Sequence, residues 1–365
     1  MESAQIFQAI EETQFLKLLS SQPRLFFVGD SAPLEYIKKF FSQLETKDDN
    51  YYYNLPDKAV TDLNSIPQIN LYQAIVVVSL KDENFLFSTV KQQLENIAHP
   101  ITLRLFADIF VNRLCDRQLL QPSSQNPQKP KTSYAILTPP RSGSTYLCDL
   151  LDSTAIAGHP SEHIRLATQE LSLNCSFDYL NLLGNLMEHR TTSNSVFGTK
   201  LISHFLFELR QAKPDFKEVF KAIDRFILLI RKDKVAQAVS LVLAQTTEVW
   251  HIHNNAKKAS YQSQLDSIEI NDELLDNVEQ KVIFIKQQED RLKRVLANHK
   301  VEPLLVVYED ILDDAPGEIN RILDFLNIVK PAGHTMQITS GIKRMPSAIS
   351  QRIIQQYQKR KSVVH

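Results

Sequence analysis

The sequence predicts an α/β fold in which a parallel sheet flanked by helices is preceded by a smaller α/β domain. Three observations support this prediction. Apolar runs of strand length alternate with runs of helical spacing along most of the chain. The C-terminal apolar runs are almost unbroken, as is typical of parallel strands that are covered on both faces. A stretch rich in proline and polar residues, 121–132, separates two parts that each have the usual size of a domain.

The N-terminal part, residues 1–120, has the alternation of a small α/β domain, whose role the sequence leaves open. It predicts strands at 24–28, 74–79 and 101–106 and helices at 34–44 and 85–97. The turn at 27–30 contains a single glycine, so it lacks the G-x-G-x-x-G pattern of a dinucleotide-binding turn. A structural role, or docking of a protein partner or a second copy of the chain, therefore fits this part better than cofactor binding.

The C-terminal part, residues 133–365, continues the alternation. Its apolar runs predict strands at 134–137, 196–202, 226–230 and 304–308. Helical spacing is found at 145–151, 233–247, 273–299 and 319–326. Open parallel sheets bind ligands at the carboxyl ends of their strands, so the loop after the first of these strands is the first place to expect a site.

That loop, residues 138–145 with the sequence Thr-Pro-Pro-Arg-Ser-Gly-Ser-Thr, has the chemistry of an anion site. Backbone N–H groups at the start of the following helix carry partial positive charge and bind phosphate-like groups. Gly143 lets the backbone approach such a ligand closely, and Arg141 offers a planar fork of donors that matches phosphate or sulfate oxygens. The loop adds three short hydroxyl donors, on Ser142, Ser144 and Thr145.

The loop shares the register of a P-loop, G-x-x-x-x-G-K-S/T, but departs from it at two positions. Thr138 stands at the first glycine and Ser144 stands at the lysine. The lysine of a P-loop reaches the phosphates of a nucleoside triphosphate, so its absence argues against a triphosphatase and against a small-molecule kinase. The expected architecture is therefore a P-loop-like parallel sheet with a different anion chemistry.

A second group of anion-binding residues follows the third strand of this part. Arg231 comes directly after that strand, and Ser240 lies nine residues further on, over two turns along the next helix. Such a pair can hold one phosphate from two sides. The last strand ends in Tyr308, whose ring can stack on an adenine, and the carboxylates of Glu309 and Asp310 suit the cap of the next segment.

Together, these strings resemble the sulfotransferases that use 3′-phosphoadenylyl sulfate (PAPS) as donor, and within them the bacterial carbohydrate family typified by trehalose 2-sulfotransferase. The likeness covers about residues 132–360 and leaves the N-terminal 120 residues outside. Its anchors are the strings at 140–145, 157–162, 197–201 and 231–250. The resemblance implies transfer of a sulfuryl group to a hydroxyl or amine of a small polar acceptor, such as a sugar or a specialised metabolite.

The resemblance also implies roles for individual residues. Residues 141–145 would hold the 5′-phosphosulfate of PAPS, and Arg231 and Ser240 would hold its 3′-phosphate. Tyr308 would lie near the adenine or on the sheet edge beside it. The pair Lys343-Arg344 would belong to a closing loop that contacts the 3′-phosphate. The product would be 3′,5′-adenosine bisphosphate (PAP). No metal is expected, because a sulfuryl group carries less charge than a phosphoryl group.

Glu162 is the candidate general base, as the corresponding Glu is in the resembling family. It lies 17 residues past Thr145, after a turn that returns the chain to the site. A base of this kind contributes about 10²–10⁴-fold to the rate. Arg141 and the loop amides would stabilise the developing charge, with Lys200 as a helper. Rival bases, matched to neutral pH by their imidazole, are His159, His163 and His204.

Composition excludes several other classes. The net charge of −1 rules out a strongly basic nucleic-acid binder, so an anion site must be a local concentration of Arg and Lys. The three cysteines form no C-x-x-C pair and no metal pattern, which fits reduced thiols in a cytoplasm. The start lacks a basic n-region and the longest apolar runs are of strand length, so neither a secretory signal nor a membrane span is expected.

Two other functions stay open beside the transferase. One is a non-catalytic nucleotide-binding or interaction protein of the same fold, and the other is the small-molecule kinase. A non-catalytic protein of this fold would be expected to have lost some of its site residues. The sequence retains all four of Arg141, Glu162, Arg231 and Ser240, which argues against that alternative. The His-x-His pair at 251–253 has no third ligand nearby, so the sequence predicts no metal site there.

Overall fold

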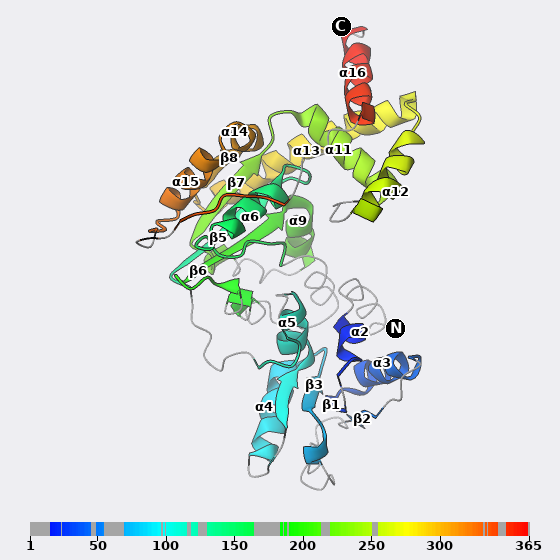
Figure 1. Cartoon of the computed structure of the whole chain (residues 1–365), viewed down its shortest axis with the longest axis vertical. Coiled ribbons are helices and arrows are strands. Elements are labelled where there is room, and N and C mark those ends of the chain that lie inside the picture. Colours follow the sequence, from blue (N-terminus) through cyan, green and yellow to red (C-terminus); the bar gives the residue numbers. More distant parts are fainter. Residues whose placement is uncertain are drawn as a thin grey trace. The chain divides into compact units, whose positions relative to one another are not determined.

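The computed structural model is an α/β structure of parallel sheets flanked by helices, as the sequence predicts (Figure 1). The described residues are 15–22, 24–44, 49–54, 69–95, 98, 100–114, 118–122, 130–163, 183–184, 186–187, 190–212, 220–249, 255–330, 333, 335–341 and 348–363. Within these ranges, no helix is both long enough and apolar enough to cross a membrane.

Contacts divide the chain into two compact units, each with one sheet. The first unit comprises residues 1–130, 163–190 and 208–222. The second comprises residues 131–162, 191–207 and 223–365. The domain boundaries expected from the sequence, around a linker at 121–132, stay a prediction, and most of that linker lies outside the described residues.

The sheet of the first unit has four parallel strands in the order β2-β1-β3-β4. They are β1 (Leu25–Gly29), β2 (Tyr51–Asn54), β3 (Ala74–Val78) and β4 (Ile101–Arg104). β1 and β3 are buried at every position, as their unbroken apolar runs predict. The sequence does not predict β2, because its Tyr-Tyr-Tyr-Asn segment shows neither an apolar run nor an alternation. β2 is a partly exposed edge strand.

The last strand of this unit is shorter than expected, because a π-helix (Leu105–Phe110) begins directly after Arg104. Two buried acidic side chains turn the chain here. Asp108 accepts the backbone N–H of Arg104 at 2.7 Å. Glu83 accepts two N–H groups in the first turn of the π-helix, at 2.9 and 3.0 Å. These donors would be directed to a neighbouring strand if the strand continued, so the two side chains favour the helix.

Helices lie against both faces of this sheet. They are α2 (Phe15–Leu19), α3 (Ser31–Ser42), α4 (Glu83–Leu94) and α5 (Val111–Leu114), with a short 3₁₀ helix at Ile69–Leu71. α3 and α4 confirm the two helices predicted here. Phe26 and Phe27 belong to separate apolar clusters, because neighbouring residues of a strand point to opposite faces.

The sheet of the second unit also has four parallel strands, in the order β6-β5-β7-β8. They are β5 (Thr132–Thr138), β6 (Val196–Ile202), β7 (Arg225–Ile230) and β8 (Leu304–Val307). All four confirm predicted strands. From β5 the chain crosses to β6 on one side and then to β7 on the other, so the loop after β5 stands where the strand order reverses, the place that binds ligands in open α/β sheets.

The helices of this unit range from the six residues of α14 to the 27 of α13. They are α6 (Ser144–Ser153), α9 (Ser203–Ala212), α11 (Lys234–Thr247), α12 (Asn255–Asp266), α13 (Asp272–Asn298), α14 (Tyr308–Asp313), α15 (Ala315–Phe325) and α16 (Ala348–Val363). α6, α11, α13 and α15 confirm the predicted helices. Three of these helices, α11, α13 and α15, begin with a side-chain cap. The side-chain oxygens of Asp233, Asn271 and Asp314 each accept a backbone N–H of the first turn.

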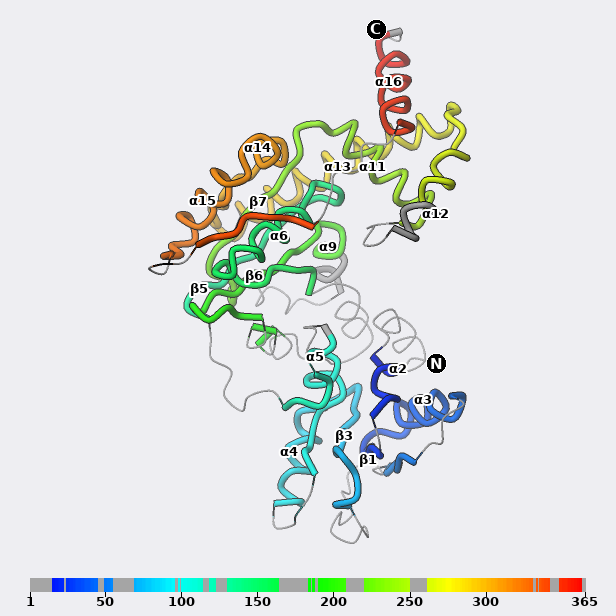
Figure 2. Tube along the Cα trace, in the orientation of Figure 1, coloured from blue at the N-terminus to red at the C-terminus, as the bar shows by residue number. Residues whose placement is uncertain are grey.

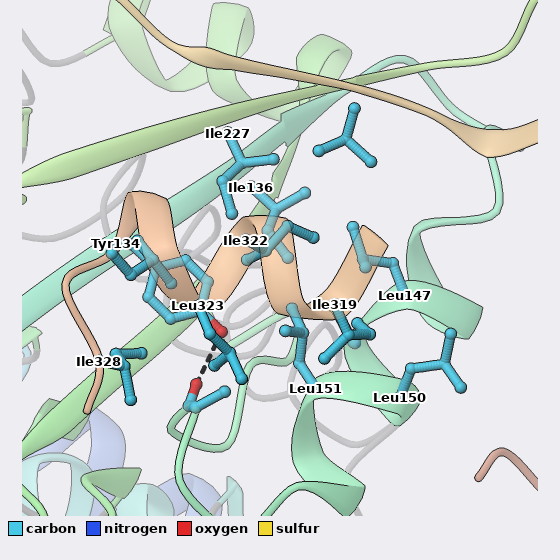
Figure 3. Close-up of a cluster of buried hydrophobic side chains, with 14 of the residues drawn as sticks. Tyr134, Ile136, Leu147, Leu150, Leu151, Ile227, Ile319, Ile322, Leu323 and Ile328 are labelled. Carbon is cyan, nitrogen blue, oxygen red and sulfur yellow. Dashed lines mark hydrogen bonds between the residues drawn. The ribbon is translucent and has the colours of Figure 1, made fainter. Parts of the chain in front are cut away.

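Two apolar clusters form the core of the second unit. In one, residues of α6 and α15 pack against the sheet around Tyr134 and Ile136 (Figure 3). In the other, α11, α13 and α16 pack on each other. Residues 335–341 run along α6 (Figure 2). They are fastened there by Asp149, which accepts the N–H of Gly341 at 2.8 Å, and by the Ser153 hydroxyl, which contacts the Gln337 carbonyl oxygen at 3.0 Å.

Candidate active site

The anion loop at 138–145 joins the end of β5 to the start of α6, and Gly143 shapes it. Gly143 precedes the helix with φ 87° and ψ 14°, a left-handed conformation that residues with a side chain rarely adopt. A Cβ at this position would lie 2.1 Å from Cδ2 of Tyr308. Glycine is therefore required here by the backbone conformation and also by the Tyr308 ring, which lies against the loop.

Buried hydrogen bonds hold the loop in place. The Thr138 hydroxyl lies 3.0 Å from the Leu229 carbonyl oxygen and is hydrogen-bonded to the Ser142 hydroxyl. Gln237 of α11 donates from Nε2 to the Pro140 carbonyl oxygen at 2.8 Å. Thr138, Ser142 and Gln237 are fully buried. The Ser142 hydroxyl is thus engaged within the protein, where it stabilises the loop.

Arg141 and Ser240, far apart in the sequence, meet at this loop. Arg141 Nε donates to Ser240 Oγ at 3.0 Å. Arg141 has a φ of 60°, a left-handed value that costs a residue with a side chain about 1–2 kcal/mol. Burial lowers the pKa of Arg141 and the nearby Arg231 lowers it further, whereas Tyr261 and Tyr308 act in the opposite direction. The structure therefore brings both predicted anion-binding groups together around Arg141.

Arg231 and Tyr308 follow the neighbouring strands β7 and β8. The guanidinium carbon of Arg231 lies 5.1 Å from the centre of the Tyr308 ring, within the range of a cation–π contact. Arg231 Nε lies 3.9 Å from Oε1 of Glu309. Tyr308 is the first residue of α14 rather than the last of β8, because the N–H groups beyond it enter a helical turn. Its ring lies close both to Gly143 of the anion loop and to the Arg231 guanidinium.

A close approach of two glycines brings the 157–162 segment against β6. Gly198 in β6 has no room for a side chain, because a Cβ would lie 2.5 Å from Cζ of Tyr134. The Tyr134 hydroxyl donates to the Ala157 carbonyl oxygen at 2.7 Å. Gly158 has a φ of 75°, and its Cβ would lie 2.7 Å from the Gly198 nitrogen. Glycine at both positions lets the chain return to the sheet just before Glu162.

Glu162, Lys200 and Thr145 meet at the end of that segment. Lys200 Nζ lies 3.4 Å from Glu162 Oε2 and donates to Thr145 Oγ1 at 3.3 Å. The Lys200 backbone N–H donates to the Ser161 carbonyl oxygen at 2.9 Å, which holds the candidate base against β6. Burial raises the pKa of the nearby Cys148 thiol to about 11, so this cysteine is not a nucleophile.

The other predicted site residues lie elsewhere or outside the described part. His159 is half-exposed, and its Nδ1 lies 2.6 Å from Asp152 Oδ1. His163 is buried and is grouped with the first unit. The His204 ring lies tilted against Phe205, with ring centres 3.9 Å apart. The pair Lys343-Arg344 and the His-x-His string at 251–253 fall outside the described residues.

Among the described residues, no group of three or more His, Cys, Asp and Glu side chains is arranged to hold a metal ion. Three described cationic side chains do lie around the loop. Arg141 and Arg231 are on the side of β7, and Lys200 is on the side of β6. Such an arrangement suits an anionic ligand held at the start of α6.

Comparison with known proteins gives the family of the chain. The model of the Stf0 sulphotransferase family matches residues 133–360. The chain belongs to this family. Family and fold together support a sulfotransferase activity. A search of curated proteins found no match.

Solved structures similar to this chain include three sulfotransferases. One, from Alicyclobacillus acidocaldarius, is 11% identical with a TM-score of 0.34, over 63% of this chain and 92% of that chain. A sulfotransferase domain from the curacin biosynthetic pathway is 16% identical with a TM-score of 0.30, over 64% and 99%. A sulfotransferase domain from the Synechococcus PCC 7002 olefin synthase is 15% identical with a TM-score of 0.30, over 66% and 98%.

Two residues near the loop are not found by sequence reasoning. Gln237 supports the loop from α11, and the only sequence signal is a polar residue on the buried face of an apolar helix. Tyr261 of α12 is half-buried, and burial raises its pKa while Arg141 lowers it. Tyr261 gives no sequence signal, because its proximity to Arg141 arises only from the fold.

Proposed function

We propose that this protein transfers a sulfuryl group from PAPS to a hydroxyl or amine of a small polar acceptor and releases PAP. The observation that carries the proposal is the pairing of Arg141 and Arg231 in a partly buried site beside Ser240. Like charges held together away from water are unfavourable until an anion lies between them. PAPS carries two anionic groups, the 5′-phosphosulfate and the 3′-phosphate, and the site has cationic groups for both.

The residues present fit this donor. The amides at the start of α6 and the Arg141 guanidinium suit the 5′-phosphosulfate. Arg231 and Ser240 suit the 3′-phosphate, since both lie beside Arg141 and neither belongs to the loop. The Tyr308 ring lies close to both the loop and Arg231, so an adenine held by these two groups would lie near its aromatic edge. Sulfuryl transfer needs no metal in principle, because positioning and fixed charges dominate such reactions.

In the proposed reaction, the acceptor oxygen or nitrogen attacks sulfur in line with the bond to the leaving phosphate. The new bond to sulfur forms as the S–O bond of the donor breaks, and the electron pair remains on the phosphate oxygen of PAP. Glu162 takes the proton of the acceptor. Lys200, which contacts both Glu162 and Thr145, lies where it can neutralise charge on the leaving oxygen.

Calorimetric titration with PAP, 5′-AMP and ATP, on the wild type and on Arg231→Ala, tests the donor site. We expect the wild type to prefer PAP and Arg231→Ala to lose that preference while still binding 5′-AMP. Equal affinity of the wild type for all three nucleotides would contradict the proposal. A preference for ATP would favour the kinase instead.

Turnover separates the enzyme from a binding module. Glu162→Gln should bind PAP like the wild type and transfer sulfate about 10²–10⁴-fold more slowly to an acceptor found by screening sugars and small polar metabolites. Wild-type protein that binds PAP but transfers to none of them would favour the non-catalytic alternative.

Cys148 is a free thiol, which supports the further proposal of a cytoplasmic setting.

A further inference from the structure

The turn that carries Arg231 is held by a carboxylate from the next strand connection. Glu309 Oε2 accepts the backbone N–H of Lys232 at 2.8 Å, and Oε1 accepts that of Asp233 at 3.1 Å. The same Oε1 lies 3.9 Å from Arg231 Nε. One side chain on α14 therefore contacts three consecutive residues after β7, including the guanidinium group that the donor site needs.

The opposite side of the turn is fixed as well. Lys234 Nζ donates to the Arg231 carbonyl oxygen at 2.5 Å and to Glu289 Oε2 of α13 at 2.5 Å. Asp233 caps α11 by accepting the N–H of Ala236 at 2.8 Å. These bonds hold the backbone at Arg231, so what remains to be set is the direction of its side chain. The Tyr308 ring and the Glu309 carboxylate are the two groups that lie against that side chain.

Glu309 is well suited to this task. Burial alone would raise its pKa, but the N–H groups of Lys232 and Asp233 and the charge of Arg231 together hold the pKa of Glu309 below its ordinary value. It is therefore a carboxylate at neutral pH. Its negative charge also offsets part of the repulsion between Arg231 and Arg141, which otherwise opposes placing both guanidinium groups at one site.

We infer that Glu309 is a positioning residue that aims Arg231 at the 3′-phosphate and so sets the preference for PAP over 5′-AMP. The inference rests on the proposed function, because it takes Arg231 as the 3′-phosphate ligand. A carboxylate near a phosphate also repels it. Glu309 is 29% exposed, so solvent weakens its action at a distance, whereas its contacts with the turn are direct. Positioning is therefore the larger effect.

The test compares Glu309→Gln with Asp310→Asn, a matched loss of charge on the next residue. Asp310 Oδ1 pairs with the side chain of Lys232 at 2.8 Å, at the exposed surface. For each protein, calorimetry gives the ratio of the affinities for PAP and 5′-AMP. We expect this ratio to fall about tenfold in Glu309→Gln, because the variant loses the charge that faces the Arg231 guanidinium and weakens the charged hydrogen bonds to the Lys232 and Asp233 N–H groups. The ratio should stay at the wild-type value in Asp310→Asn, and the 5′-AMP affinity should stay constant in both.

A second background separates positioning from general damage. In Arg231→Ala, adding Glu309→Gln should change the ratio no further, because there is no guanidinium group left to aim. A further tenfold fall there would overturn the inference, as would an unchanged ratio or tighter PAP binding in Glu309→Gln alone. A wild type without any preference for PAP would instead remove the proposed function itself.

If thermal unfolding shows that Glu309→Gln does not fold, Glu309→Asp takes its place. This variant keeps the charge but withdraws it by one methylene group, so the contacts with the turn lengthen. The PAP preference should again fall, by several-fold, with the 5′-AMP affinity unchanged. A wild-type ratio in Glu309→Asp would overturn the inference.

Discussion

Replacing Lys200 by Met is expected to destabilise the second unit, and replacing Glu162 by Gln at the same time is expected to restore most of that stability. The two side chains are only 4% and 14% exposed, and the charged atoms lie 3.4 Å apart. Two unit charges at that distance attract by about 5 kcal/mol at an effective dielectric constant of about 20. Taking both charges out of water costs several kcal/mol, so the attraction is largely offset in the wild type.

The single and double variants separate these two effects. Lys200→Met retains the cost of burying Glu162 but loses the attraction, so it should lose about 3 kcal/mol of unfolding free energy. The double variant buries neither charge, and Met and Gln have similar volumes. It should therefore unfold within about 1 kcal/mol of the wild type and be about 2–4 kcal/mol more stable than Lys200→Met alone. Glu162→Gln alone completes the cycle, and the coupling is the loss in the double variant minus the losses in both single variants.

Urea unfolding followed by far-UV circular dichroism, on the wild type, both single variants and the double variant, measures this coupling. Lys232→Met is the matched control, since its ammonium group pairs with Asp310 at the exposed surface and should matter little. Strictly additive losses in the double variant would refute the ion pair as the reason for the effect. The double variant should stay inactive, and recovered transfer activity would refute Glu162 as the base.

Three further outcomes are expected. Gly143→Ala should lose about 2 kcal/mol or more of stability and most PAP affinity by calorimetry, because its φ is 87° and its Cβ would lie 2.1 Å from Tyr308; wild-type binding would contradict the loop geometry. Burial raises the pKa of Glu83 to about 8 from 4.5, so the folded protein keeps a proton that the unfolded chain releases. Stability is then full below about pH 4.5 and falls as pH rises through 8, by up to about 1.4 kcal/mol per pH unit, and urea midpoints should show this slope in the wild type but not in Glu83→Gln. In a variant with Cys148 as its single cysteine, iodoacetamide at pH 8 should label the thiol only after unfolding, since burial raises its pKa to about 11; rapid labelling of the native protein would contradict this.

The strands that the sequence predicts are those with unbroken apolar runs. β3 and β6 are found at or near their predicted bounds, because buried parallel strands need apolar side chains on both faces. β2 is missed since an exposed edge strand is free of that requirement. The end of β4 is misjudged because the side chains of Glu83 and Asp108, one of them from another helix, decide where the strand stops.

The candidate site divides in the same way. Arg141, Arg231 and Ser240 are predicted because their residue types and their positions after strands are enough to indicate an anion site. Gln237 is missed because its partner is a carbonyl oxygen 97 residues away, and a backbone partner leaves no trace in residue types. Glu309 is expected only as a helix cap, and its contact with Arg231 follows from the adjacency of β7 and β8.

Two groups of charged side chains lie at the start of α6, toward the strands on either side of β5. On the side of β7, Arg141 and Arg231 leave an excess of positive charge for the donor, and Glu309 offsets only part of it. On the side of β6, Lys200 is matched by Glu162, so that side is near neutral and suits an uncharged acceptor. A carboxylate base placed among the arginines would compete with the donor for them. Because each group lies beside a different strand, Arg231→Ala should weaken PAP binding yet leave the stability coupling between Lys200 and Glu162 unchanged.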